Sequence, residues 1–169
     1  MATSNRDRIL PSLLDRLTDD DPVNQSVGRG GGSMAVSELR RSVLRDLNWL
    51  FNTTQLATAG ELDAYPQVRN SIINYGLPAL SGIAASMLDI GQLERSLQQA
   101  IIDFEPRLLA DTVSVKANLD RDDVDHHNVV SLQIEGMLWA QPAPIELLLR
   151  TEFDLESGQS IVAESTTRK

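Results

Sequence analysis

Glu105 has the most distinctive setting of any carboxylate in this chain, because Pro106 separates it from the positively charged Arg107. Proline fixes its own φ and pushes the preceding residue into extended geometry, so we expect a helix to end here and a strand to begin. In an extended segment, residues two apart point to the same side. The sequence therefore predicts a polar fork framed by Phe104 and Leu108, a pattern suited to recognising another protein. The alternative is a helix-ending turn with a solvated salt bridge, since surface ion pairs are common and weak.

The same residues argue against catalysis. A glycosidase needs two carboxyl groups, one of which must hold a proton at working pH. Arg107 favours the charged form of Glu105, which is the wrong direction for a general acid. A Ser-His-Asp enzyme would need His126 or His127 as its base, and neither lies near a nucleophile-elbow motif. We therefore predict no catalytic residue.

Residues 120–127, Asp-Arg-Asp-Asp-Val-Asp-His-His, combine carboxylates with imidazoles and so raise the question of a metal site. A calcium loop needs a central glycine and a terminal glutamate, and both are missing. Zinc favours histidines on a rigid element rather than adjacent in a hairpin loop. We expect a solvated acidic hairpin, with no metal and no cofactor. Residues 28–32, Gly-Arg-Gly-Gly-Gly, lack the Lys-Ser/Thr ending of a phosphate loop and indicate a linker.

Composition bounds the class of protein. With 169 residues, 41% of them hydrophobic, the chain suits one domain with a real core. A net charge of −9 argues against binding to nucleic acid, because phosphate affinity depends on Lys and Arg. The absence of cysteine excludes disulfides, thiolate metal sites and cysteine nucleophiles. Residues 1–7 do not resemble a signal peptide, and no apolar stretch approaches the roughly 20 residues that span a bilayer. We expect a cytoplasmic protein without direct membrane insertion.

Three parts are expected along the chain. Residues 1–34 hold a short amphipathic helix, over 8–18, followed by a Gly-rich flexible linker that frees this helix to dock on a neighbouring molecule. Residues 35–163 form the main domain, and residues 164–169 are a polar tail.

Helices are predicted to come first in the main domain. Residues 36–51 have one apolar stripe, and residues 89–104 have another, with Asp89 as the N-cap. Residues 65–78 indicate a loop–helix–loop that packs onto the core. Arg40, Arg41 and Arg45 lie mostly off the first stripe, as a solvated basic face or a site for an acidic partner. Trp49 and Trp139 are expected in the core or in an interface.

Strands follow the helices. Hydrophobic residues alternate over 113–119, over 130–138 with a break at Gly136, and over 145–153. Residues 161–163 are a possible short fourth strand. Short connections favour an antiparallel meander, so the fold class is α+β, with the helices packed on one face of a three- to four-stranded sheet. The edges of this sheet are open to pairing.

Six segments occur in a characteristic order over residues 10–163. They are Leu13-Leu14-Asp15-Arg16-Leu17, Ser42-Val43-Leu44-Arg45-Asp46-Leu47-Asn48-Trp49-Leu50, Tyr65-Pro66, Asn74-Tyr75-Gly76-Leu77-Pro78, Phe104-Glu105-Pro106-Arg107-Leu108 and Ile134-Glu135-Gly136-Met137-Leu138. Together these segments resemble one family, the TssE baseplate wedge subunits of bacterial type VI secretion systems, which are similar to a small wedge protein of contractile-tailed phages.

This resemblance implies a structural protein, although the family has carried a lysozyme-like label. It implies that Glu105, Pro106 and Arg107 contact other wedge subunits, with TssF, TssG and TssK as baseplate partners. It also implies that a sheet edge, from residues 145–153 or 161–163, accepts a strand of the sheath proteins TssB and TssC. The expected location is cytoplasmic, at a baseplate docked on the inner membrane. The alternatives are a peptidoglycan muramidase and a regulatory adaptor with the same fold.

Overall fold

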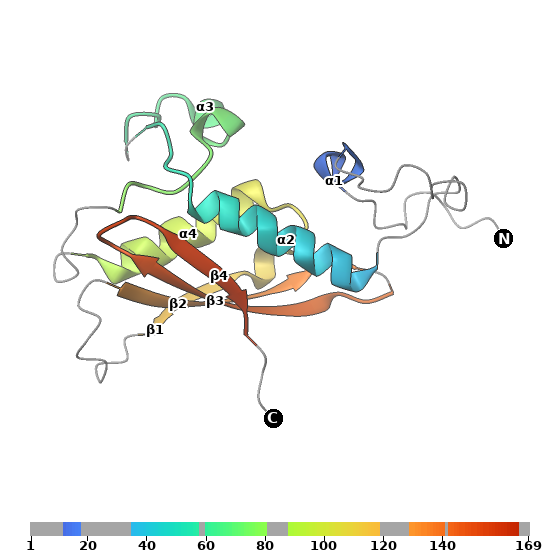
Figure 1. Cartoon of the computed structure of the whole chain (residues 1–169). Helices are drawn as coiled ribbons and strands as arrows, with labels where there is room; N and C mark the ends of the chain where they lie inside the picture. The colour runs from blue at the N-terminus through green and yellow to red at the C-terminus, as the bar shows by residue number, and fades with distance from the viewer. Residues whose placement is uncertain are drawn as a thin grey trace.

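The computed structural model of the chain describes residues 12–17, 35–57, 60–80, 88–118, 129–140 and 142–165. The Gly-rich stretch 28–32 and the acidic stretch 120–127 lie outside the described residues. The architecture is α+β, as predicted, with helices followed by a four-stranded sheet (Figure 1). The helical elements are α1 (Leu13–Leu17), α2 (Val36–Phe51), α3 (Pro66–Arg69), η3 (Ile72–Asn74), α4 (Ile90–Phe104) and η5 (Ala110–Thr112). The strands are β1 (Ser114–Asn118), β2 (Val129–Leu138), β3 (Ile145–Asp154) and β4 (Ser160–Glu164).

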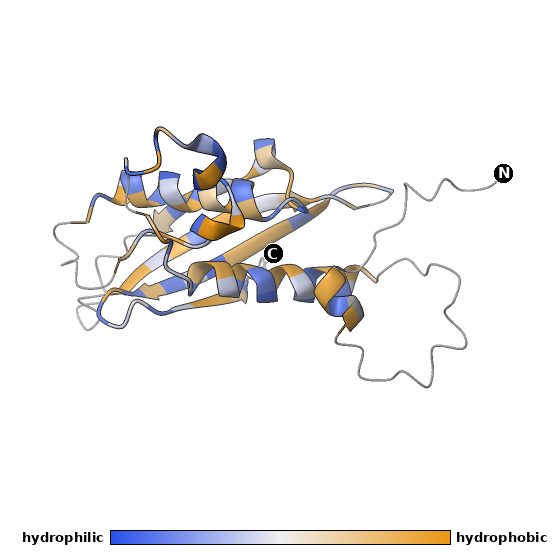
Figure 2. Ribbon diagram, turned by 90° about the horizontal axis from the view of Figure 1, so that it is seen from above, coloured by the Kyte–Doolittle hydropathy of each residue, from blue (hydrophilic) through white to orange (hydrophobic). Residues whose placement is uncertain are grey.

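The sheet is an antiparallel meander in the order β1-β2-β3-β4, and α2 and α4 both lie over the same face of it (Figures 1 and 2). The strand predicted over 130–138 is confirmed, because β2 runs without interruption from Val129 to Leu138, across the glycine that breaks the hydrophobic alternation. Gly136 makes room for a neighbouring segment: a Cβ there would lie 3.3 Å from Leu108 Cδ2.

The core lies between the two long helices and the sheet. The predicted stripe of α2 is buried except for the exposed Val36, and Asp89 caps α4 by accepting a hydrogen bond from the Gln92 N–H at 3.0 Å. Trp49 and Trp139 are exposed, so the expectation that they could belong to the core is wrong. The buried residues that the two helices contribute are Leu39, Val43, Leu47, Leu50, Phe51, Leu93, Leu97, Ala100 and Ile101.

The segment between α2 and α4 forms the predicted loop–helix–loop. Gly76 has a φ of 123°, and a Cβ there would lie 2.4 Å from the Thr53 carbonyl oxygen. Only glycine allows two backbone segments to approach so closely. Leu77 exchanges backbone hydrogen bonds with Thr53 and Gln55 at 2.8 and 2.9 Å, which fastens this excursion to the end of α2.

Both ends of α2 are tied to β3 and β4. Arg40 bonds the Glu164 carboxylate and donates to the Glu146 carbonyl oxygen at 2.9 Å. At the other end, Asn52 donates to the Ser160 carbonyl oxygen at 3.0 Å and accepts from the Ser160 N–H at 2.9 Å. These contacts fix the helix across the strands.

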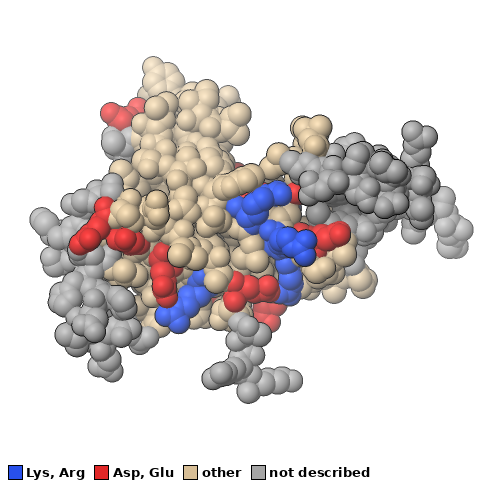
Figure 3. Space-filling view, in the orientation of Figure 1, with Lys and Arg blue, Asp and Glu red and all other residues tan. Residues whose placement is uncertain are grey.

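The arginines of α2 are only partly the solvated basic face that the sequence allowed. Arg40 and Arg45 form ion pairs within the chain, whereas Arg41 is exposed. Figure 3 shows basic side chains gathered in one band on this side of the molecule, with acidic side chains directly beside them. Ion pairs within the chain therefore neutralise the positive charges of Arg40 and Arg45.

The outer strands of the meander are β1 and β4, because β3 pairs with β2 on one side and with β4 over Leu149–Phe153 on the other. The sequence left residues 145–153 and 161–163 as alternatives for the free edge. The first alternative is wrong for Leu149–Phe153, because these residues pair with a strand on each side. In β4, Ser160 points its N–H and C=O outward to Asn52. Backbone groups alternate along a strand, so Val162 and Glu164 also point theirs outward.

Candidate functional site

The Glu105-Pro106-Arg107 segment forms the predicted helix exit. α4 ends at Phe104, and Glu105 has a φ of −121° and a ψ of 77° while its N–H still donates to the Ile101 carbonyl oxygen at 2.8 Å. Pro106 enforces this geometry on the residue before it. The sequence suggested that a strand begins directly after this exit, and that expectation is wrong. A turn and η5 come first, and β1 begins only at Ser114.

Glu105 and Arg107 do share one side, as predicted, and they form a bidentate pair. Arg107 Nε donates to Glu105 Oε1 at 2.7 Å and Nη2 donates to Oε2 at 2.5 Å, while the Arg107 backbone N–H adds a bond to Oε1 at 3.1 Å. The side chain of Glu105 is 3% exposed and that of Arg107 is 26% exposed. The pair is therefore not the solvated surface bridge of the alternative interpretation.

Two residues of α2 complete this arrangement. Arg107 Nη1 donates to Ser42 Oγ at 2.8 Å, and Nη2 donates to Asp46 Oδ2 at 2.5 Å. Ser42 and Asp46 are four positions apart on one helix, so their side chains lie on the same face. The guanidinium group thus binds the exit of α4 to the middle of α2.

A second arginine extends the network to α1. Arg45 Nε donates to Asp46 Oδ1 at 2.9 Å, and its Nη1 bonds Asp15 Oδ1. Ser42 Oγ donates to Asp15 Oδ2 at 2.8 Å, and the Arg45 guanidinium lies 5.1 Å from the centre of the Trp49 ring. We call the six charged or hydroxyl-bearing residues of this network the clasp: Asp15, Ser42, Arg45, Asp46, Glu105 and Arg107.

The pKa values of Asp15, Arg107 and the neighbouring Tyr75 depart from their ordinary values. Burial raises the pKa of Asp15, but hydrogen bonds from Arg45, Ser12 and Ser42 outweigh it and hold that pKa well below its ordinary value. Burial lowers the pKa of Arg107, and the contacts with Glu105 and Asp46 reverse the effect and raise it. Burial, together with the charges of Asp46 and Glu105, raises the pKa of Tyr75. At neutral pH these shifts keep Asp15 and Arg107 charged and the Tyr75 hydroxyl protonated.

A hollow of about 430 Å³ lies against the clasp. Aromatic and apolar side chains surround its charged wall, which is typical of protein-binding surfaces. Trp49 is 48% exposed at this hollow, and Pro106 is exposed at the turn between the two members of the fork. The residues that line it include Ser12 and Leu14 at α1, Trp49 of α2, Tyr75 directly after η3, and Phe104 and Pro106 at the exit of α4.

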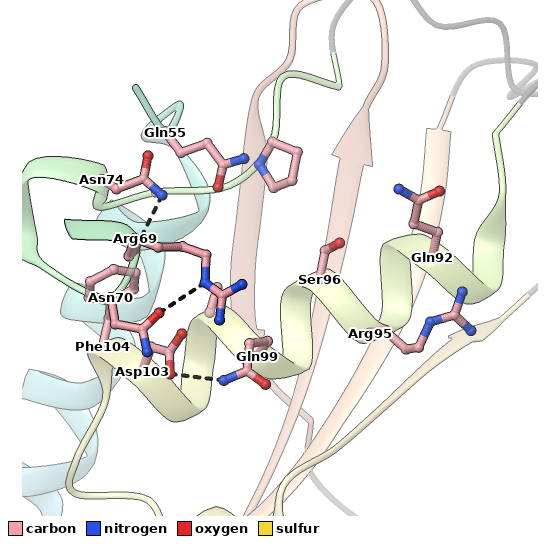
Figure 4. Close-up of a pocket in the computed structure, with 13 residues that line it drawn as sticks. Gln55, Arg69, Asn70, Asn74, Gln92, Arg95, Ser96, Gln99, Asp103 and Phe104 are labelled. Carbon is pink, nitrogen blue, oxygen red and sulfur yellow. Dashed lines mark hydrogen bonds between the residues drawn. The ribbon is translucent and has the colours of Figure 1, made fainter. Parts of the chain in front are cut away.

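A second hollow, of about 490 Å³, lies between the α3–η3 segment and α4 (Figure 4). Asn74 is buried and shapes its wall by donating to the Arg69 carbonyl oxygen at 3.2 Å and accepting from the Ala57 N–H at 3.0 Å. Gln99 and Asp103 of α4 bond each other at 2.9 Å on the opposite side. Most of the side chains that line this second hollow are polar, and the loop–helix–loop was its one signal in the sequence.

Sequence reasoning found the fork but missed the other members of the clasp. Asp15, Ser42 and Asp46 occur in ordinary amphipathic helices, and their contacts with residues 27 to 65 positions away leave no local pattern. Within the part of the chain that the structure describes, no three His, Cys, Asp or Glu side chains are grouped to hold a metal ion. The described helices include none that is long and apolar enough to cross a membrane.

Comparison with known proteins supplies the family. A search of the curated proteins found no match. A family model described as baseplate wedge protein gp25 matches residues 37–143, which is more than half of the chain. The matched stretch includes α2, α4, β1, β2 and every member of the clasp except Asp15, and it confirms the resemblance that the sequence motifs predicted. This chain therefore belongs to the baseplate wedge protein gp25 family.

Proposed function

We propose that this chain is a structural baseplate subunit of a type VI secretion system, which binds the other wedge subunits and helps to initiate assembly of the contractile sheath. The observation that carries the proposal is the bidentate Glu105–Arg107 pair, fixed to α2 beside a hollow walled by aromatic side chains. A partner that covers this surface would remove water from the clasp, and charged hydrogen bonds count for more there than on a free surface.

The two members of the fork have different tasks in this proposal. Glu105 is buried and holds Arg107 in place, so it positions the contact rather than making it. Pro106 and the exposed part of Arg107 form the surface that meets the partner. TssF and TssG are the expected partners at this surface, and TssK is expected in the same baseplate.

The sheet edge is the second proposed contact. β4 leaves the backbone groups of Val162 and Glu164 pointing outward, which suits addition of a strand from the sheath proteins TssB and TssC. The edge of β1 suits it less, because Glu94 and Gln98 of α4 bond the Ala117 N–H and the Val113 carbonyl oxygen at 2.7 and 2.8 Å. Residues 161–163 are therefore our choice over 145–153.

The same geometry supports a non-enzymatic role. A muramidase would need a catalytic carboxyl group that reaches the glycan. Glu105 is buried and accepts three hydrogen bonds from Arg107, so its carboxylate is not accessible to a glycan. Cell-wall hydrolysis by the purified chain, abolished by Glu105→Gln, would favour the enzyme instead.

Co-purification with TssF and TssG tests the proposed function. Pro106→Glu changes the exposed turn without removing any member of the clasp, so we expect a chain that still folds and that binds at least tenfold more weakly. Arg150→Ala is the control that should bind normally. Arg150 forms an exposed pair with Glu152 on the face of the sheet that points away from the helices. Normal binding by Pro106→Glu and by a folded Arg107→Ala variant would overturn the fork as a wedge contact.

A further inference from the structure

Ser42 and Arg45 form a receptor for a carboxylate group, and the carboxylate that fills it comes from a separate element. Arg45 Nη1 bonds one oxygen of Asp15, and Ser42 Oγ donates to the other at 2.8 Å. The Arg45 guanidinium group lies over the ring of Trp49. A guanidinium and a hydroxyl that bind one carboxylate through both oxygens make a selective site for an acidic side chain.

The hydrogen bonds of Ser42 explain why this receptor favours a carboxylate. A hydroxyl has one proton to donate and two lone pairs to accept with. Arg107 Nη1 and Arg45 Nη2 donate to Ser42 Oγ at 2.8 and 3.3 Å and occupy both lone pairs. The single proton of Ser42 therefore points away from the two arginines, toward the oxygen of Asp15. Without an acceptor at that point, the proton would lose its partner.

The helix that supplies Asp15 is short, and its leucines are exposed. The described part of α1 is five residues long, well below the roughly 12 residues at which an isolated helix becomes even marginally stable. Leu13 and Leu17 are 70% and 75% exposed, so the leucine stripe predicted over residues 8–18 does not bury these two side chains in this chain. Residues 18–34 join α1 to the rest of the molecule. In this arrangement α1 is a tethered ligand of α2.

We propose that the Ser42–Arg45 receptor is a binding site for an aspartate or glutamate presented by a helix of a partner subunit, and that α1 fills the site until that helix displaces it. Charge complementarity and the fit of Asp15 itself define the partner's chemistry. A competitor must overcome an effective concentration of α1 on the order of 1 mM. Apolar contacts with Trp49 and the adjoining hollow would supply the extra affinity. The receptor is inferred from the contacts of Ser42 and Arg45 alone, whereas the identification of its partner as a wedge subunit rests on the proposed function.

A peptide of residues 8–19, added to the full-length chain, tests the receptor directly by fluorescence anisotropy. In the Asp15→Asn chain the tethered ligand is weakened, so we expect the peptide to bind at least tenfold more tightly than it binds the wild-type chain. The same peptide with Asp15→Asn should bind at least tenfold more weakly. Equal binding to the wild-type and Asp15→Asn chains would overturn the proposal.

Changes in the receptor give the second readout. Combined with Asp15→Asn, Arg45→Ala should abolish peptide binding and Arg45→Lys should weaken it, because lysine cannot bind in the fork geometry. Arg150→Ala in the same background is the control. If Arg45→Ala does not fold, Arg45→Lys decides, and unchanged binding by this variant would contradict the proposed receptor.

Co-purification separates this inference from the proposed function. If α1 competes with a wedge subunit, the Asp15→Asn chain should bind TssF and TssG several-fold more tightly than the wild-type chain. Weaker binding would mean that docked α1 belongs to the partner surface, and the competition would be wrong. If no variant binds TssF and TssG while the peptide results hold, the receptor stands and the wedge assignment fails.

Discussion

Arg107 Nη1 donates a hydrogen bond to Ser42 Oγ at 2.8 Å and so connects α4 to α2 across 65 positions of sequence. The contact converts a local acid–base pair at a helix end into a joint between two helices. It also explains why Glu105 can be buried, because its partner Arg107 is held on three sides by Glu105, Asp46 and Ser42.

Ser42→Ala should lower the free energy of unfolding by about 2 kcal/mol, because two guanidinium groups and one carboxylate lose a hydrogen-bond partner. Urea titration of the purified chain measures this. Ser37→Ala, at an exposed position of the same helix, is the matched control and should change stability by less than about 0.5 kcal/mol. Equal stability of the two variants would show that the clasp does not hold the helices together.

The contribution of Asp15 to stability should depend on pH. The pKa of this residue is lower in the folded chain than its ordinary value of 3.8, so the carboxylate stabilises the folded state fully above that value. The stabilisation is lost as the pH falls through the lower, folded-state pKa. The difference in stability between the wild-type and Asp15→Asn chains should therefore be constant from neutral pH to about pH 5 and shrink below about pH 4. A difference that stays constant down to pH 2 would contradict the ion pair with Arg45.

Gly76→Ala should destabilise the chain strongly, by about 3 kcal/mol or more, because it adds a steric clash to backbone strain. The new Cβ would lie 2.4 Å from the Thr53 carbonyl oxygen. Gly60→Ala separates the two effects: Gly60 also has a positive φ, of 93°, but within the described part of the chain its Cβ would meet no atom closer than 4.0 Å. Thermal melts should show a loss of about 1 kcal/mol for Gly60→Ala. Similar melting temperatures for the two variants would exclude the clash.

Thr151→Val should stabilise the chain by about 1 kcal/mol, because the buried hydroxyl of Thr151 has no hydrogen-bond partner among the described residues and valine has nearly the same shape. Thr112→Val is the matched control. The Thr112 hydroxyl donates to the Leu109 carbonyl oxygen at 2.7 Å and accepts from the Met137 N–H at 2.9 Å, so its loss should be destabilising. Opposite signs in chemical denaturation are the expected result, and a loss of stability in both variants would contradict it.

Proline substitutions in β4 should distinguish the outer edge from the ladder with β3. The Val162 N–H points outward, so Val162→Pro removes no hydrogen bond of the sheet, although some packing of its side chain is lost. The Ala163 N–H points toward Arg150 of β3, so Ala163→Pro should lower the melting temperature more. If Val162→Pro is the less stable variant, the assignment of the outward groups is wrong.

The elements of this fold were largely predictable, because local signals define them. The N-cap Asp89 and the Glu105-Pro106 stop give the two ends of α4, and alternation of hydrophobic residues gives the strands. Gly136 breaks the hydrophobic alternation of β2 without ending the strand, and the sequence pattern alone did not reveal that this glycine makes room for Leu108.

The site was predictable only in part, for a different physical reason. Glu105 and Arg107 are two residues apart, so their pairing follows from the local backbone. Asp15, Ser42 and Asp46 enter through the packing of one helix on another, which no spacing within a helix encodes. Trp49 was expected in the core or an interface because of its size, and the contact with Arg45 places it at the surface.

The ties at Arg40 and Asn52 have a mechanical consequence for β4. Asn52 holds the backbone at Ser160, where the strand begins, and Arg40 holds the Glu164 side chain, where it ends. A pull on this strand must therefore load α2 at both ends at once, rather than peel the ladder open one bond at a time. Tension delivered to the rim of the sheet would spread through the helix into the interior of the molecule.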